Sequence, residues 1–105
     1  MLDDERSAGS IRGPLHGIPI LIKNNIATYD MMGATAGSWA LAGAKVPMDA
    51  TVARKLRAAG AIIIGKTSIT QWANFRSLNA SNGWSALGSQ VYGPYFPESR
   101  SVGQF

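Results

Sequence analysis

The stretch Gly13-Pro-Leu-His-Gly-Ile-Pro-Ile-Leu-Ile-Lys-Asn-Asn25 decides how the chain folds. Its centre, residues 18–22, is apolar and rich in β-branched side chains, with Gly and Pro before it and polar residues after it, which is typical of a short buried strand. Lys23 therefore stands where a buried strand ends. A lysine that is desolvated at such a place can act as a base. The alternative is a lysine whose stem lies along apolar neighbours while its charge reaches water.

A second apolar run, residues 61–65, has three isoleucines in succession, the pattern of a strand buried on both faces. Residues 50–59 are predicted to form a helix, because Asp49 can cap its start and Gly60 can end it. The apolar residues that share one face of this helix are Val52, Leu56 and Ala59. This order of segments predicts an α/β fold in which 18–23 and 61–65 are adjacent parallel strands.

Two further residues invite a catalytic interpretation. Lys66 follows the second predicted strand just as Lys23 ends the first, so residue type and position leave both lysines as candidates for a base. Ser38 has no basic neighbour, and a serine hydroxyl without one is a poor nucleophile. We expect Ser38 to cap a short helix within residues 36–43 or to serve as a turn residue.

The remaining segments carry weaker patterns. Residues 1–12 are acidic and then small and polar, which indicates a solvated lead-in. Residues 69–75 are predicted to form one or two helical turns with Trp72 and Phe75 inward. Residues 78–97 are rich in Ser, Asn and Gly, and we expect a long ordered loop whose aromatic side chains either line a substrate pocket or cover the core.

The composition restricts the class of protein. The chain has 105 residues, of which 46% are hydrophobic, as in a globular segment. No apolar run approaches the roughly 20 residues that span a bilayer. The acidic residues near the start disagree with a secretory signal, and the absence of cysteine excludes disulfides. We expect a cytoplasmic location and no membrane span.

The net charge of +4 raises the question of nucleic-acid binding. The basic residues are spread along the chain, and the only cluster consists of Arg54, Lys55 and Arg57. No aromatic residues interleave with this cluster, as binding of a single strand would favour. On the predicted helix the cluster lies opposite the apolar face. We therefore expect a solvated surface and no nucleic-acid partner.

Several short words of sequence follow one another along the chain. They are Gly-Pro-Leu-His-Gly-Ile-Pro at 13–19, Thr-Ala-Gly-Ser at 35–38, Gly-Ala-Ile-Ile-Ile-Gly-Lys-Thr at 60–67, Trp-Ala-Asn-Phe-Arg-Ser at 72–77 and Gly-Trp-Ser-Ala at 83–86. In this collinear order they resemble the amidase signature family of hydrolases. The resemblance implies a partial amidase-signature domain over residues 1–97 and a divergent tail over 98–105.

The resemblance also implies a role for Lys23, since Lys23 occupies the position of the family's catalytic lysine and Lys66 does not. In that family the lysine works with two serines of a downstream Gly/Ser-rich loop, and the site hydrolyses a carboxamide without metal or cofactor. Two positions depart from the pattern. Asn24 stands where the family usually has Asp, and Gln71 stands where many relatives have Glu.

The serine loop is expected just past Pro97, but residues 98–105 contain no Gly-Ser-Ser run. Ser99 and Ser101 are expected to belong to a frayed tail. We therefore expect a fragment of a hydrolase for small-molecule amides that is inactive by itself. The alternative is a non-catalytic fragment that docks on a homologue or another partner, or that associates with itself through exposed sheet edges.

Overall fold

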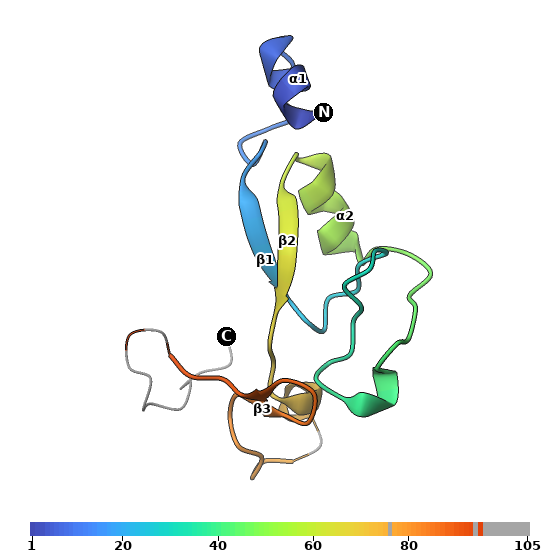
Figure 1. Cartoon of the computed structure of the whole chain (residues 1–105), viewed down its shortest axis with the longest axis vertical. Helices are drawn as coiled ribbons and strands as arrows, with labels where there is room; N and C mark the ends of the chain where they lie inside the picture. Colours follow the sequence, from blue (N-terminus) through green and yellow to red (C-terminus); the bar gives the residue numbers. More distant parts are fainter. Residues whose placement is uncertain (76, 94, 96–105) are drawn as a thin grey trace.

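The computed structural model of the chain describes residues 1–75, 77–93 and 95. Its centre is a pair of parallel strands, β1 (Pro19–Lys23) and β2 (Ile62–Thr67), with helix α2 (Thr51–Ala58) beside them (Figure 1). The predicted α/β fold with adjacent parallel strands is confirmed, with boundaries shifted by one or two residues. The core between the helix and the strands consists of Ile22, Ala53 and Ile63, with Ile20, Ile26 and Leu56 packed against it.

Helix α2 ends at Ala58, and Gly60 terminates it from two residues beyond, as the sequence predicts. Gly60 has φ +86°, its N–H donates to the Arg57 carbonyl at 3.0 Å, and the N–H of Ala61 donates to the Leu56 carbonyl at 3.0 Å. These two bonds satisfy the last carbonyls of the helix. A Cβ at Gly60 would lie 2.8 Å from His16 Cα, so glycine also lets the word Gly-Pro-Leu-His-Gly approach the helix end.

Two details of α2 differ from the prediction. Val52 is 47% exposed, whereas its neighbour Ala53 is completely buried. The sheet that the described residues form has two strands, so it contacts the narrow stripe through Ala53 and Leu56 rather than the wider predicted face. Asp49 does not cap the helix, because its carboxylate accepts the Tyr29 N–H at 2.6 Å.

A bulge in the strand pair determines which side chains share a face. Ile20 pairs with Ile63, but the register then shifts so that Leu21 pairs with Gly65 and leaves Ile64 as the extra residue. Beyond the bulge Ile22 is opposite Lys66, and Lys23 is opposite Thr67. Since neighbours across a sheet point to the same side, Lys66 lies on the covered face with Ile22, and Lys23 lies on the other face.

That other face contradicts the prediction of strands buried on both sides. Within the described part of the chain α2 packs on one face alone. The large apolar side chains of the strands that are left exposed by more than a third on this face are Leu21, Ile62 and Ile64. We call these three residues the open face. It forms because apolar runs in the two strands need a cover on each side, and α2 supplies one.

The first residues form a helix where a solvated lead-in was expected. Helix α1 (Leu2–Ser7) is attached to the rest of the chain through His16, which is buried. The Nε2 atom of His16 donates to the Leu2 carbonyl at 2.9 Å, and the Arg6 guanidinium donates to the His16 carbonyl at 3.1 Å. Tertiary hydrogen bonds therefore hold a helix that has too few apolar residues to show periodicity.

The predicted helix over 36–43 is reduced to one 3₁₀ turn, η1 (Trp39–Leu41). Ala36 and Gly37 precede it with φ of 49° and 76°, a left-handed conformation that no right-handed helix can contain. The expected cap is confirmed, because Ser38 Oγ accepts the Ala40 N–H at 3.2 Å.

The region after β2 also differs in part from the expectation. A short turn, η2 (Gln71–Asn74), lies where helical turns were predicted, but Trp72 and Ala73 within it have left-handed backbone angles. Phe75 is 91% exposed rather than inward. The expected long loop contains a small antiparallel hairpin of β3 (Trp84–Ser85) and β4 (Ser89–Gln90). The tail over 98–105, with Ser99 and Ser101, lies outside the described residues.

Candidate functional site

Lys23 is the last residue of β1, at the carboxyl end of the strand pair. Alternation along the strand puts it on the open face with Leu21, and its side chain is partly exposed. Among the described residues no hydrogen bond or ion pair involves its ammonium group. The carboxyl ends of parallel strands are where α/β proteins place their ligands. Lys23 is thus presented at the edge where a site would form.

The backbone around Lys23 is fixed by two hydrogen bonds. The Asn24 N–H donates to the Thr67 carbonyl at 3.1 Å and extends the ladder between β1 and β2 by one step. The Ile26 N–H donates back to the Lys23 carbonyl at 2.9 Å and closes a turn. Lys23 therefore lies between a strand and a turn, and the hydrogen bonds of both restrain its backbone.

Asn24 joins this turn to the loop that contains Thr35. Its Nδ2 donates to Thr35 Oγ1 at 2.9 Å, and its Oδ1 accepts the Thr35 N–H at 3.2 Å. Thr35 Oγ1 also accepts the Gly37 N–H at 3.3 Å. The asparagine that departs from the family pattern thus makes a reciprocal contact with the loop and leaves no polar atom unused.

The left-handed residues Ala36 and Gly37 connect three segments. The carbonyl of Ala36 accepts the Trp72 N–H at 3.0 Å, and the carbonyl of Gly37 accepts the Leu87 N–H at 3.1 Å. A Cβ on Gly37 would lie 2.6 Å from the Cβ of Ser85, whose side chain is buried. The turn at 35–38 therefore links the end of β1 to η2 and to the hairpin.

A pocket of about 290 Å³ opens beside η2. Its lining is formed by Thr70, Gln71, Trp72, Asn74, Ser77, Ala80 and Trp84. Trp72, Ala73 and Asn74 all have left-handed backbone angles, with φ between 53° and 62°. Such conformations cost free energy and concentrate at functional sites. Of the aromatic residues in 78–97 that the sequence assigned either to a pocket or to the core, Trp84 lines this pocket, together with Trp72 of η2.

Gln71 has a structural contact at the position where many relatives have Glu. Its Oε1 accepts the Ala86 N–H at 3.0 Å. A carboxylate could accept the same hydrogen bond, so the change of Glu to Gln removes a charge and preserves the contact.

Lys66, the rival base, is on the covered face and its ammonium group donates to the Ile26 carbonyl. Burial lowers the pKa of Lys66 below its ordinary 10.5, and Arg57 adds to this effect while Asp30 and Asp49 oppose it. The side-chain nitrogen of Lys66 is thus directed at a backbone oxygen on the side of the sheet opposite Lys23.

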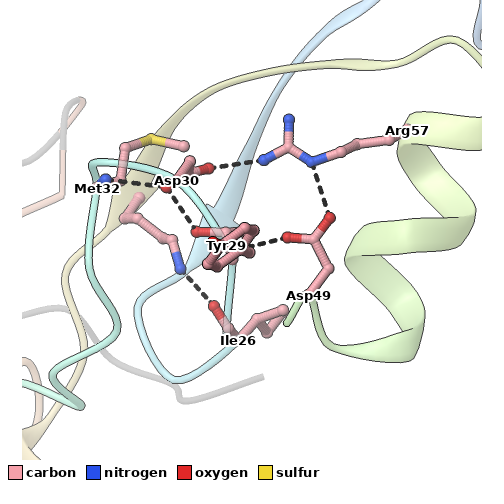
Figure 2. Close-up of polar contacts among 8 residues, drawn as sticks. Ile26, Tyr29, Asp30, Met32, Asp49 and Arg57 are labelled. Carbon is pink, nitrogen blue, oxygen red and sulfur yellow. Dashed lines mark hydrogen bonds and ion pairs between the residues drawn. The ribbon is translucent and has the colours of Figure 1, made fainter. Parts of the chain in front are cut away.

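Arg57 joins the loop after Lys23 to helix α2 (Figure 2). Its Nη2 atom donates to Asp30 at 2.6 Å, and its Nε donates to Asp49 at 3.2 Å. Burial alone would raise the pKa of Asp30, but hydrogen bonds from the Met32 N–H, Thr28 and Arg57 outweigh it and hold that pKa below 3.8. Arg57 was assigned by its sequence cluster to a solvated face, and no local pattern indicates these two carboxylate partners.

Within the described ranges, no group of three His, Cys, Asp or Glu side chains could hold a metal ion. In the same part of the chain, no helix has the length and apolarity that crossing a bilayer requires.

Comparison with known proteins points to one family. The family model described as Amidase matches residues 1–89. A putative amidase from Arthroderma benhamiae is 62% identical over 90% of this chain, which is 16% of the relative. A probable amidase from Arabidopsis thaliana is 51% identical over 77% of this chain and 16% of its own length.

Solved structures give the same result. The peptide amidase of Stenotrophomonas maltophilia superposes with a TM-score of 0.82 at 49% identity, covering 91% of this chain and 19% of that enzyme. The chain therefore spans about a sixth of the length of the curated relatives it matches.

Proposed function

Because the chain belongs to the amidase family, we propose that Lys23 is the general base of a site that hydrolyses a carboxamide to an acid and ammonia or an amine. One observation carries the proposal. Lys23 is presented at the carboxyl end of β1 on the open face, whereas Lys66 donates to the Ile26 carbonyl on the covered face. The proposed substrate is a small-molecule amide.

The 105 residues by themselves are proposed to be inactive. A base activates a hydroxyl only within hydrogen-bond reach, about 2.6–3.2 Å. Ser38, the serine of the turn at 35–38, is buried and its Oγ accepts the Ala40 N–H. Ser99 and Ser101 lie outside the described residues. The nucleophile and the oxyanion donors are thus proposed to come from elsewhere, as the family resemblance implies.

A chimera tests this proposal. The part of this chain that superposes on the Stenotrophomonas maltophilia peptide amidase replaces the matching 19% of that enzyme. We expect the chimera to hydrolyse a simple aryl amide, and the 105-residue chain alone to show no turnover. Replacement of Lys23 by Ala should lower the turnover of the chimera by about 10²–10⁴-fold.

The matched control is Lys55→Ala, which removes an exposed lysine of α2 and should leave turnover unchanged. A folded chimera whose turnover survives Lys23→Ala would contradict the proposed role of Lys23. Turnover by the isolated chain that Lys23→Ala abolishes would contradict the proposed inactivity of the 105 residues.

A second proposed function is docking or self-association without catalysis, and the open face favours it. Leu21, Ile62 and Ile64 are exposed on the same side of a two-stranded sheet, and such apolar surface drives association. Sedimentation of the 105-residue chain should show oligomers that Ile64→Lys reduces. The control substitution Met31→Lys, at an exposed loop residue, should not change them. A monomer at all accessible concentrations would refute self-association.

A further inference from the structure

The Lys66 side chain reaches the loop that follows Lys23. The bulge in β2 places Lys66 opposite Ile22 on the covered face, one pair before Lys23 and Thr67. From there its ammonium group donates to the Ile26 carbonyl, and the Ile26 N–H donates to the Lys23 carbonyl at 2.9 Å. A single residue, Ile26, therefore connects Lys66 on the covered face to Lys23 on the opposite face through both of its backbone polar groups.

The next part of the loop is attached to α2 through a set of charges. Asp30 receives three hydrogen bonds, from Thr28 Oγ1 at 3.0 Å, from the Met32 N–H at 2.9 Å and from Arg57 at 2.6 Å (Figure 2). Thr28 is completely buried, so this contact is screened from water. Asp30 thereby holds both ends of the segment 28–32 and fixes them to the helix.

Asp49 completes the attachment from the other side. Its Oδ1 accepts the Tyr29 N–H at 2.6 Å and its Oδ2 accepts from Arg57 Nε at 3.2 Å. The charges of Asp30, Asp49, Arg57 and Lys66 sum to zero, so the set compensates itself without a counter-ion from solvent. We call these four residues the loop clamp.

We propose that Lys66, supported by the other three residues of the loop clamp, is a positioning residue that holds the Lys23–Ile26 turn in one conformation. The effect of this positioning on catalysis rests on the proposed role of Lys23. The positioning itself does not depend on that role. A misplacement of about 1 Å at a reacting group costs roughly a hundredfold in rate, so a fixed turn matters to a base at its edge.

Lys66 is not itself the base in this scheme. Its side-chain nitrogen donates to the Ile26 carbonyl, so it is directed at a backbone oxygen and not at the edge where Lys23 lies. Lys66 therefore acts through the turn.

Amide hydrogen exchange of the 105-residue chain tests the positioning without any assay of catalysis. In Lys66→Met, which keeps the length of the side chain but removes the donor, the Ile26 N–H should exchange about ten- to hundredfold faster, as expected for the loss of a hydrogen bond to a charged donor. The Ala59 N–H, which donates to the Lys55 carbonyl in α2, should not change. Lys66→Arg should restore most of the protection of Ile26.

General destabilisation would accelerate Ile26 and Ala59 alike and would overturn the proposal. A measurement on the unmodified chain covers the case in which Lys66→Met fails to fold. Carbon relaxation of the lysine Cε groups should show Lys66 restrained and the exposed Lys55 mobile. Equal mobility of the two would also overturn the proposal.

The chimera with peptide amidase separates this inference from the proposed function. Lys66→Met should lower kcat about a hundredfold with little change in KM, Lys66→Arg should recover most of the loss, and Lys55→Met should have no effect. If Lys23→Ala leaves turnover intact, the proposed function fails while the exchange data still decide the role of Lys66. If Lys23→Ala abolishes turnover and Lys66→Met does not alter kcat, the positioning inference alone fails.

Discussion

Gly37 is the position where a single methyl group should disturb the chain most. Its φ of 76° costs an alanine about 1–2 kcal/mol. The new Cβ would also lie 2.6 Å from Ser85 Cβ and 3.0 Å from Ser85 Oγ, against a residue that is 1% exposed. Overpacking of this kind costs about 1–3 kcal/mol. Gly37→Ala should therefore lower the free energy of unfolding by roughly 2–5 kcal/mol, a large part of the stability of a small domain.

Two other glycines separate the backbone cost from the steric cost. Gly33 and Gly43 have φ of 67° and 78°, but a Cβ at either position meets nothing within 4 Å. Gly33→Ala and Gly43→Ala should each cost about 1–2 kcal/mol in urea unfolding monitored by tryptophan fluorescence. Adding Ser85→Gly to Gly37→Ala should recover part of the stability that is lost to the steric contact. If Gly37→Ala lowers the free energy of unfolding no more than Gly43→Ala does, the turn at 35–38 does not approach the hairpin as closely as described.

The other predictions concern the polar contacts around Lys23. Asn24→Asp should change the free energy of unfolding by less than about 0.5 kcal/mol, because the Thr35 hydroxyl can turn to donate to the new carboxylate. Asn24→Leu removes the acceptor of the Thr35 N–H and should cost about 1–3 kcal/mol in the same urea unfolding. The pKa of Asp30 is lowered in the folded chain, so ionised Asp30 contributes fully to the free energy of unfolding above pH 3.8, and this contribution is lost as pH falls through the folded pKa. In acid titrations followed by circular dichroism, Asp30→Asn should lose less stability over this range than the unmodified chain. The pKa of Lys66 is also lowered, but for a lysine this means that the folded chain binds fewer protons than the unfolded chain between the lowered pKa and 10.5. The free energy of unfolding should therefore rise with pH in that window. Thermal unfolding at increasing pH should show this rise in the unmodified chain and not in Lys66→Met.

Local sequence determines the two strands, the helix between them and the end of that helix. Apolar runs bounded by Gly and Pro specify β1 and β2, and Gly60 specifies the helix stop, because each depends on residues adjacent in the chain. The hydroxyl of Ser38 caps its turn for the same reason. The collinear words that resemble an amidase agree with the family match over residues 1–89.

Which faces the helix and strands bury was predicted less well. Three isoleucines in succession predict burial on both faces, but burial depends on what covers a strand, and only α2 does so in the described chain. Val52 and Phe75 are exposed for the same reason, since an apolar side chain is buried only where a partner surface reaches it. The left-handed angles of Ala36 and Trp72 are likewise set by long-range hydrogen bonds and not by residue type.

The difference between the two lysines depended on the tertiary structure. Lys23 and Lys66 each end an apolar strand, so the amino-acid sequence by itself made both candidates and left the family resemblance to choose. In the fold one extra residue in β2, Ile64, shifts the register and sends Lys66 to the covered face, where it meets the Ile26 carbonyl, while Lys23 stays on the open face. A bulge is a property of the pairing of two strands, and the pairing brings together residues that lie about 40 positions apart in the chain.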